Sequence, residues 1–191
     1  MYEYISGNLA KLEPTQAVID CGGVGYLMEI TLYSYEQLQK SEGIVKLLVH
    51  EVIREDAHIL YGFCEEAERE LFRMLIGVNG VGSQTARVML SSMSVEELCQ
   101  SIANEDAKRV QKVKGIGAKT AQRIVLELKD KIGGNWKSSG ATPVLTTANK
   151  EEALSALVML GFPKAAADKV LQGLDASLSV EELIKEALKR L

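Results

Sequence analysis

A nine-residue pattern occurs twice, first as Val78-Asn-Gly-Val-Gly-Ser-Gln-Thr-Ala86 and again, 35 residues later, as Val113-Lys-Gly-Ile-Gly-Ala-Lys-Thr-Ala121. Each copy follows an apolar helical segment, and each Thr-Ala pair is expected to open a new helix. Glycine tolerates positive φ and lets a ligand approach the backbone closely. The first turn of a helix presents unpaired N–H groups and the positive end of the helix dipole. Each copy therefore predicts a tight turn that can bind an anion such as a phosphate.

Two such turns in tandem indicate two phosphates on one polymer, and the pattern resembles the helix-hairpin-helix modules that bind DNA without reading its sequence. An ordinary interhelical turn is the alternative, which the duplication disfavours. Because the donors are backbone N–H groups, the glycines should matter more than the side chains of Ser83 or Ala118. Lys119 adds a cation where the first copy has Gln84, so the first hairpin should contribute less to salt dependence. The candidate DNA contacts are Gly80, Gly82, Ser83, Gln84, Gly115, Gly117, Ala118, Lys119, Thr120 and Arg123.

The distribution of charge supports a nucleic-acid partner although the net charge is −4. Residues 1–62 carry 4 basic and 9 acidic side chains, and residues 63–107 carry 3 and 8. Residues 108–131 carry 8 basic and 2 acidic side chains, a local charge of +6 around the second hairpin. A solvated helix face would explain this run equally well by itself. Its coincidence with a phosphate-binding turn favours DNA, because phosphate contacts supply most non-specific affinity.

Composition places the chain among globular proteins, with 47% apolar and 25% charged residues. It has no apolar run near the ~20 residues that a membrane helix needs and no pattern of a signal peptide at its N-terminus. Its cysteines, Cys21, Cys64 and Cys99, are widely spaced and are expected to be reduced core thiols without a zinc site. We therefore expect a cytoplasmic protein with no membrane partner and no cofactor.

The pattern of the chain predicts an α+β protein of several domains. Residues 1–64 are rich in short β segments with one small helix, which is typical of an OB-like barrel. Residues 65–132 should form the all-α tandem helix-hairpin-helix domain, and residues 133–148, rich in Gly, Ser, Thr and Pro, a flexible linker. Residues 149–191 should form a three-helix bundle, whose Leu160-Gly-Phe162 turn resembles the ubiquitin-associated type. Helix starts are predicted at Ser34, Ser94, Asn104, Asn149 and Ser179.

The turn Arg54-Glu55-Asp56 (the acidic turn) is by itself an ordinary polar β-turn. It belongs, however, to the stretch Arg54-Glu-Asp-Ala-His-Ile-Leu-Tyr-Gly-Phe63, which follows Gly22-Gly-Val-Gly-Tyr26 and precedes the two hairpins. Together with the C-terminal bundle, these motifs identify the chain by resemblance as a member of the RuvA family, over essentially its whole length. The resemblance implies a subunit that binds four-way (Holliday) DNA junctions in recombination and repair.

The resemblance further implies that the barrel forms a homotetramer, with Glu55 and Asp56 as an acidic pin at its centre. It implies partners as well: the RuvB ATPase, bound by the C-terminal bundle, and the RuvC resolvase in the full complex. Leu157, Leu160 and Phe162 are candidate motor contacts, although each could equally belong to the core. Either one or two tetramers could hold a junction. The chain departs from many relatives at Ser83-Gln84, where Pro-Lys is common, and its linker is short.

Two enzymatic interpretations are weaker. Lys114-Gly-Ile-Gly-Ala-Lys-Thr120 lacks the glycine spacing of a phosphate-binding loop of ATPases, so the ATPase motor is not expected in this chain. The resemblance implies a non-catalytic subunit. A helix-hairpin-helix DNA glycosylase could use Lys119, but it needs an Asp about eighteen residues later, where Lys137 stands. A generic helix-hairpin-helix scaffold for repair nucleases would explain the hairpins but not the acidic turn.

Overall fold

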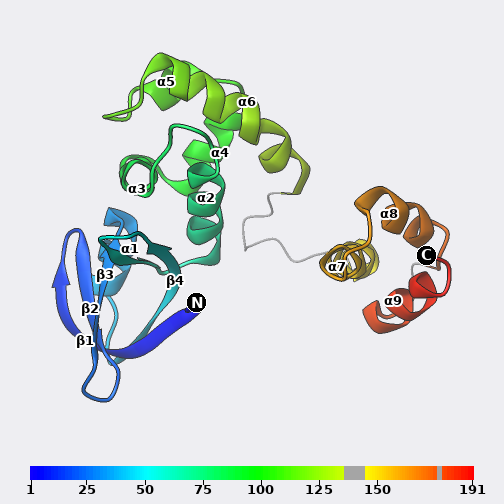
Figure 1. Ribbon diagram of the computed structural model, residues 1–191, viewed down its shortest axis with the longest axis horizontal. Coiled ribbons are helices and arrows are strands. Elements are labelled where there is room, and N and C mark those ends of the chain that lie inside the picture. Colours follow the sequence, from blue (N-terminus) through cyan, green and yellow to red (C-terminus); the bar gives the residue numbers. More distant parts are fainter. Residues whose placement is uncertain (136–144, 176–177) are drawn as a thin grey trace. The chain divides into compact units, whose positions relative to one another are not determined.

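The computed structural model describes residues 1–135, 145–175 and 178–191. The chain divides into two compact units, Met1–Ser139 and Gly140–Leu191, and each is described by itself (Figure 1). The middle of the predicted linker, including Lys137, lies outside the described residues. Among the described residues, no helix is long and apolar enough to cross a membrane.

The N-terminal part of the first unit is a closed five-stranded barrel, as the β pattern predicts. The strands are β1 (Tyr4–Glu13), β2 (Gln16–Asp20), β3 (Gly25–Ile30), β4 (Ile44–Ile53) and β5 (His58–Phe63), and α1 (Leu32–Gln39) lies between β3 and β4. The order around the barrel is β1-β2-β3-β5-β4. β3 and β5 pair in parallel and all other neighbours are antiparallel. The interior is apolar: Ile19, Met28, Leu47 and Val49 have no exposed surface.

After the barrel, the described part of the first unit forms five helices: α2 (Glu66–Ile76), α3 (Ser83–Ser92), α4 (Val95–Ala103), α5 (Ala107–Gln111) and α6 (Ala118–Asn135). Their core includes two barrel residues, Tyr61 and Phe63, whose rings each lie 5.0 Å from the ring of Phe72 on α2. The barrel and the helices are therefore packed together across the predicted boundary after residue 64. The predicted fold class, a barrel followed by tandem helix-hairpin-helix elements and a C-terminal bundle, is confirmed.

Three of the five predicted helix starts are wrong, because side chains expected as caps serve other elements. Thr31 caps α1, since Ser34 is buried and donates to Glu68 Oε2 at 2.8 Å. Asp106 caps α5, whereas Asn104 ends α4. Asn149 lies inside α7 and donates to the Leu178 carbonyl. Ser94 and Ser179 do form the predicted capping boxes.

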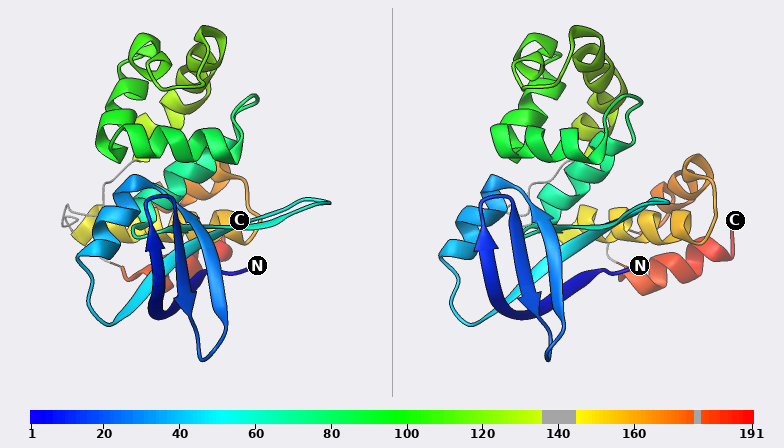
Figure 2. Two further views of the ribbon diagram at one scale, coloured as in Figure 1. Left: turned by 90° about the vertical axis from the view of Figure 1, so that its left-hand side faces the viewer. Right: turned by 60° about the vertical axis from the view of Figure 1, so that its left-hand side comes forward.

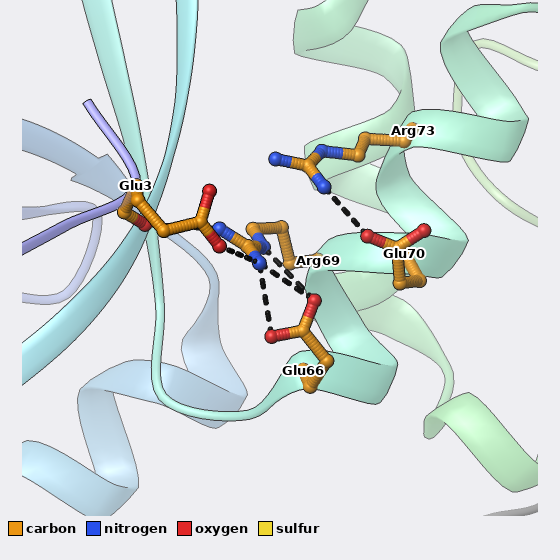
Figure 3. A network of polar contacts seen from close by, with 5 residues as sticks. All are labelled: Glu3, Glu66, Arg69, Glu70 and Arg73. Carbon is orange, nitrogen blue, oxygen red and sulfur yellow. Dashed lines mark hydrogen bonds and ion pairs between the residues drawn. The ribbon is translucent and has the colours of Figure 1, made fainter. Parts of the chain in front are cut away.

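Two arginines bind the barrel to the helices. Arg69 on α2 is almost fully buried and donates to the carbonyl of Glu3, at 2.9 Å, and to its carboxylate, while also pairing with Glu66 (Figure 3). Arg87 on α3 donates to the Thr15 carbonyl at 2.9 Å and pairs with the carboxylate of Glu29. A buried arginine needs such partners, because an unpaired charge in the interior is strongly destabilising. These contacts hold the helices in one orientation on the barrel.

A buried carboxyl group lies at the same boundary. Glu68 on α2 is 1% exposed and accepts hydrogen bonds from the hydroxyls of Thr31 and Ser34. Burial raises the pKa of Glu68 from 4.5 to about 7, although both hydroxyls favour the charged form. Above that pH the folded protein must hold a buried negative charge.

The free energy of unfolding is expected to fall as the pH rises from about 5 to about 8. Because the folded pKa of Glu68 exceeds the unfolded value, its stabilising contribution is complete below pH 4.5 and is lost through pH 7. The loss should reach at most about 3 kcal/mol. Glu68→Gln keeps an acceptor for Thr31 and Ser34 but should remove this slope. Burial lowers the pKa of His50, which acts in the opposite direction, so the readout is the difference between wild type and variant in urea unfolding. Identical slopes would contradict the assignment.

The second unit consists of α7 (Leu145–Met159), α8 (Lys164–Gln172) and α9 (Val180–Leu188). Its described residues form a hydrophobic core of Ala153, Leu157, Ala167, Leu171, Leu174, Leu183 and Ala187. α6 ends at Asn135 and α7 begins at Leu145, so helices occupy both ends of the segment 133–148 that is predicted to be a linker.

Candidate nucleic-acid interface

The two repeated turns have nearly the same backbone geometry. Gly80 has φ 91° and Gly115 has φ 92°. In each turn, the N–H of the residue after this glycine donates a hydrogen bond to the carbonyl of the valine that begins the pattern. Val81 donates to Val78 at 3.0 Å, and Ile116 donates to Val113 at 3.1 Å. These four apolar side chains are buried, which fixes each turn on the core. α3 and α6 then begin at Ser83 and Ala118, two residues before the predicted Thr-Ala pairs.

Neither steric contact nor backbone conformation requires glycine at the second glycine of each turn. Gly82 has φ −83° and ψ 165°, an extended conformation that any residue can adopt. Gly117 is likewise not one of the glycines with positive φ. A Cβ atom added at Gly82 or Gly117 would meet nothing within 4 Å. Both residues are exposed and lie directly before a helix N-terminus. A bare backbone in open space is what close approach of an external anion to N–H groups requires.

Arg123 joins the two hairpins. It lies on α6, which follows the second turn, and its Nη1 donates to the Asn79 carbonyl of the first turn at 3.1 Å. Its Nε lies 3.9 Å from Glu127, and the side chain is half-exposed. The first turn therefore lies beside α6, the helix that follows the second turn, and the guanidinium of Arg123 adds positive charge beside the first turn.

The other predicted contact residues divide into two groups. Gln84, Ala118 and Lys119 are exposed on the first turns of their helices, and Thr120 is half-buried. Ser83, in contrast, is 6% exposed, and its Oγ accepts a hydrogen bond from the Tyr61 hydroxyl at 3.0 Å. The side chain of Ser83 therefore holds the first hairpin on β5, and only its backbone can face a ligand. Tyr61 has a positioning role that nothing in the sequence pattern indicated.

The acidic turn forms the tip of the β4–β5 hairpin. The strands stay paired to Ile53 and His58, and the Arg54 N–H donates to the Ala57 carbonyl at 2.8 Å. Glu55 and Asp56 are exposed at this tip, which projects beyond the rest of the barrel (Figure 2). The carboxylates make no hydrogen bond or ion pair with any residue that the structure describes, so they are free to act on an external charge.

The candidate motor contacts lie in different environments. Leu157 is fully buried in the core of the second unit, Phe162 is half-buried against it, and Leu160 is 61% exposed. Met159 is 87% exposed and lies next to Leu160 at the end of α7. A partner could reach Met159 and Leu160 directly, whereas Leu157 supports the bundle from inside.

Metal chemistry has no evident site in the described part of the chain, where no three His, Cys, Asp or Glu side chains are grouped to hold an ion.

The chain is similar to known proteins over its whole length. Family models match at residues 1–62 (RuvA N-terminal domain), 72–130 (SAM-like helix-hairpin-helix tandem) and 148–191 (RuvA C-terminal domain). Proteins from Christiangramia forsetii and Bacteroides fragilis are 46% and 45% identical to this chain, with 100% of each sequence covered. One from Cytophaga hutchinsonii is 44% identical, with 99% of each covered. All three are named Holliday junction branch migration complex subunit RuvA.

Proposed function

Because this chain belongs to the RuvA family of Holliday junction branch migration complex subunits, we propose that it binds four-way DNA junctions through the backbone N–H groups of its two hairpins. The observation that carries the proposal is the pair of matched turns, in which Gly82 and Gly117 expose bare backbone at two helix N-termini. Contacts to phosphates position a protein on DNA without reading bases. Binding is therefore independent of sequence.

Recognition of the junction comes from symmetry. Two hairpins on each chain of a homotetramer supply two for each of the four arms, and a fourfold assembly matches a four-armed ligand. The barrels form the centre of this assembly. One tetramer would leave one face of the junction open, and two would enclose it.

The acidic turn provides discrimination against other DNA. Four copies of Glu55 and Asp56 at the centre would repel phosphates by about 1 to 4 kcal/mol per close pair, depending on the local dielectric. Duplex running straight across the centre would incur this repulsion, whereas the strands of a junction separate there and avoid it. Preference for a junction thus depends on a penalty against linear duplex.

The chain acts as a non-catalytic subunit of a larger complex. The motor is a separate ATPase, RuvB, which the second unit recruits through the exposed end of α7, and RuvC joins when the junction is resolved. At the hairpins, Gly82 and Gly117 expose backbone, and Gln84 and Lys119 are exposed on the first turns of α3 and α6, a set suited to holding phosphates. Titration of the purified chain against a synthetic four-way junction and a linear duplex of the same arm sequences tests the proposal. Equal affinity for the two, or unaided ATP hydrolysis, would contradict it.

Neutralising the acidic turn should erode the preference for junctions. In the variant Glu55→Gln with Asp56→Asn, binding to linear duplex is expected to tighten by about 5- to 10-fold while junction binding stays equal or tightens slightly, because the repulsion acts on duplex alone. Competition between labelled junction and unlabelled duplex measures the ratio. Glu42→Gln, an exposed carboxylate in the loop before β4, is the control for a change of overall charge. Loss of all binding in the double variant would be inconsistent with a repulsive role.

A further inference from the structure

A groove lies beside the second hairpin on the first unit. One wall is the end of α3 and the start of α4, with Ser92, Met93 and Glu97, and the other carries Arg109, Lys112 and Lys114. It encloses about 480 Å³ and is open to solvent. Lys114 directly precedes Gly115 of the hairpin, so this basic groove continues from the exposed backbone of the second turn.

The charge of the basic groove is only partly compensated. Arg109 Nη2 donates to Glu97 Oε1 at 3.0 Å, and Glu97 also closes the capping box of α4. Lys112 and Lys114 are exposed, and their side-chain amines make no hydrogen bond or ion pair with any residue in the described ranges. Three cations against one carboxylate leave a local excess of positive charge, which an anionic ligand would relieve.

The fold does not need these cations. The first turn has almost the same backbone geometry, yet the residues 35 positions before Arg109, Lys112 and Lys114 are Met74, Gly77 and Asn79, all uncharged. The helix-hairpin-helix structure therefore forms equally well without the charges. Their presence beside the second turn alone points to a ligand of that turn, and a long (CH₂)₄ stem lets each lysine reach outwards.

We propose that the basic groove is an additional DNA-backbone site, in which Lys112 and Lys114 bind phosphates adjoining the one held by the N–H groups of the second hairpin. Arg109 lines the site and is held there by Glu97. This inference rests on the proposed binding of DNA and adds a contact that the first hairpin does not have. The second hairpin then dominates the dependence of binding on salt, because each neutralised phosphate contributes to that dependence.

Lys112→Gln and Lys114→Gln are each expected to weaken junction binding by about 5-fold at moderate salt. Each should also reduce the slope of log K against log[salt] by about 0.9 for every chain that contacts the junction, or about 3.6 for a tetramer. Lys108→Gln is the matched control, because Lys108 is exposed on α5, four residues before Lys112, but does not line the groove. It should change both quantities by less than half as much. Equal effects in all three variants would overturn the proposal, since the lysines would then act only through overall charge.

A junction arm with single methylphosphonate substitutions, which neutralise one phosphate at a time, locates the contact. At some positions, the methylphosphonate should weaken binding of the wild type but not of Lys112→Gln or Lys114→Gln. At the same positions, it should still weaken binding of Lys108→Gln. If no position loses its effect in either groove variant, the groove does not contact the backbone. Failure of the wild type to prefer a junction would instead overturn the proposed function, because the comparison of lysines can be repeated on linear duplex.

Discussion

Replacing Gly82 and Gly117 together by alanine is expected to weaken junction binding by at least about 100-fold without unfolding the protein. Each added methyl group projects into space that is empty in the chain but that a phosphate must enter. Loss of one charge-assisted hydrogen bond per hairpin costs about 1.5 to 3 kcal/mol, and two hairpins reach the stated change in affinity. Fluorescence anisotropy with a labelled junction measures it, and calorimetry measures stability.

The melting temperature of this variant should stay within a few degrees of wild type, because two small effects oppose each other. Alanine lowers the entropy of the unfolded chain and so stabilises by about 0.4 to 1 kcal/mol. At the N-cap of a helix, where Gly82 lies, alanine is worse than glycine by a similar amount.

Two sets of variants control for the mutation itself. Gly173→Ala introduces the same methyl group at the end of α8, with negative φ and only ordinary contact at 3.5 Å, and should leave DNA binding unchanged. Gly80→Ala and Gly115→Ala force alanine into the left-handed region at φ 91° and 92°, so they should lower stability by about 1 to 2 kcal/mol each. If Gly82→Ala with Gly117→Ala binds junctions normally, backbone donation at these turns is not the basis of affinity.

Removing residues 140–191 is expected to abolish stimulation of the RuvB motor while changing junction affinity by less than about twofold. The hairpins and the acidic turn belong to the first unit, and all their described core contacts come from residues of that unit. The truncated chain therefore keeps the whole proposed DNA surface. Branch migration and ATP hydrolysis by added RuvB measure coupling, and a gel shift measures binding. Loss of junction binding would show that the DNA surface extends into the second unit.

Two point variants in the second unit distinguish a direct contact with the motor from an effect on the folding of the bundle. Leu160→Asp changes an exposed side chain and should remove coupling while the bundle stays folded. Leu157→Ala removes a fully buried side chain and should destabilise the bundle by about 2 to 5 kcal/mol, so any lost coupling would follow its unfolding. Normal coupling by Leu160→Asp would place the motor contact elsewhere on the bundle.

Structural features that depend on residues close together in the sequence were predicted correctly, whereas contacts between distant residues were not. The short strands of the barrel, the repeated turns and the capping boxes at Ser94 and Ser179 follow from residues within a few positions of one another, and all are present. Ser34 and Asn149 also have the composition of helix caps, but their side chains bond to Glu68 and to the Leu178 carbonyl. Partners 34 and 29 residues away cannot be inferred from a local pattern.

By itself the sequence determined that this protein has two glycine turns before helices, an acidic β-turn and a cationic segment, because backbone conformation and charge are set by residue type and short-range spacing. Only the tertiary structure decided that Ser83 faces Tyr61, that Arg123 reaches the first hairpin, that Leu157 is inside and Leu160 outside, and that Lys112 and Lys114 line a groove. The direction of a side chain depends on which distant elements pack against its own, and that packing arises only when the whole unit folds.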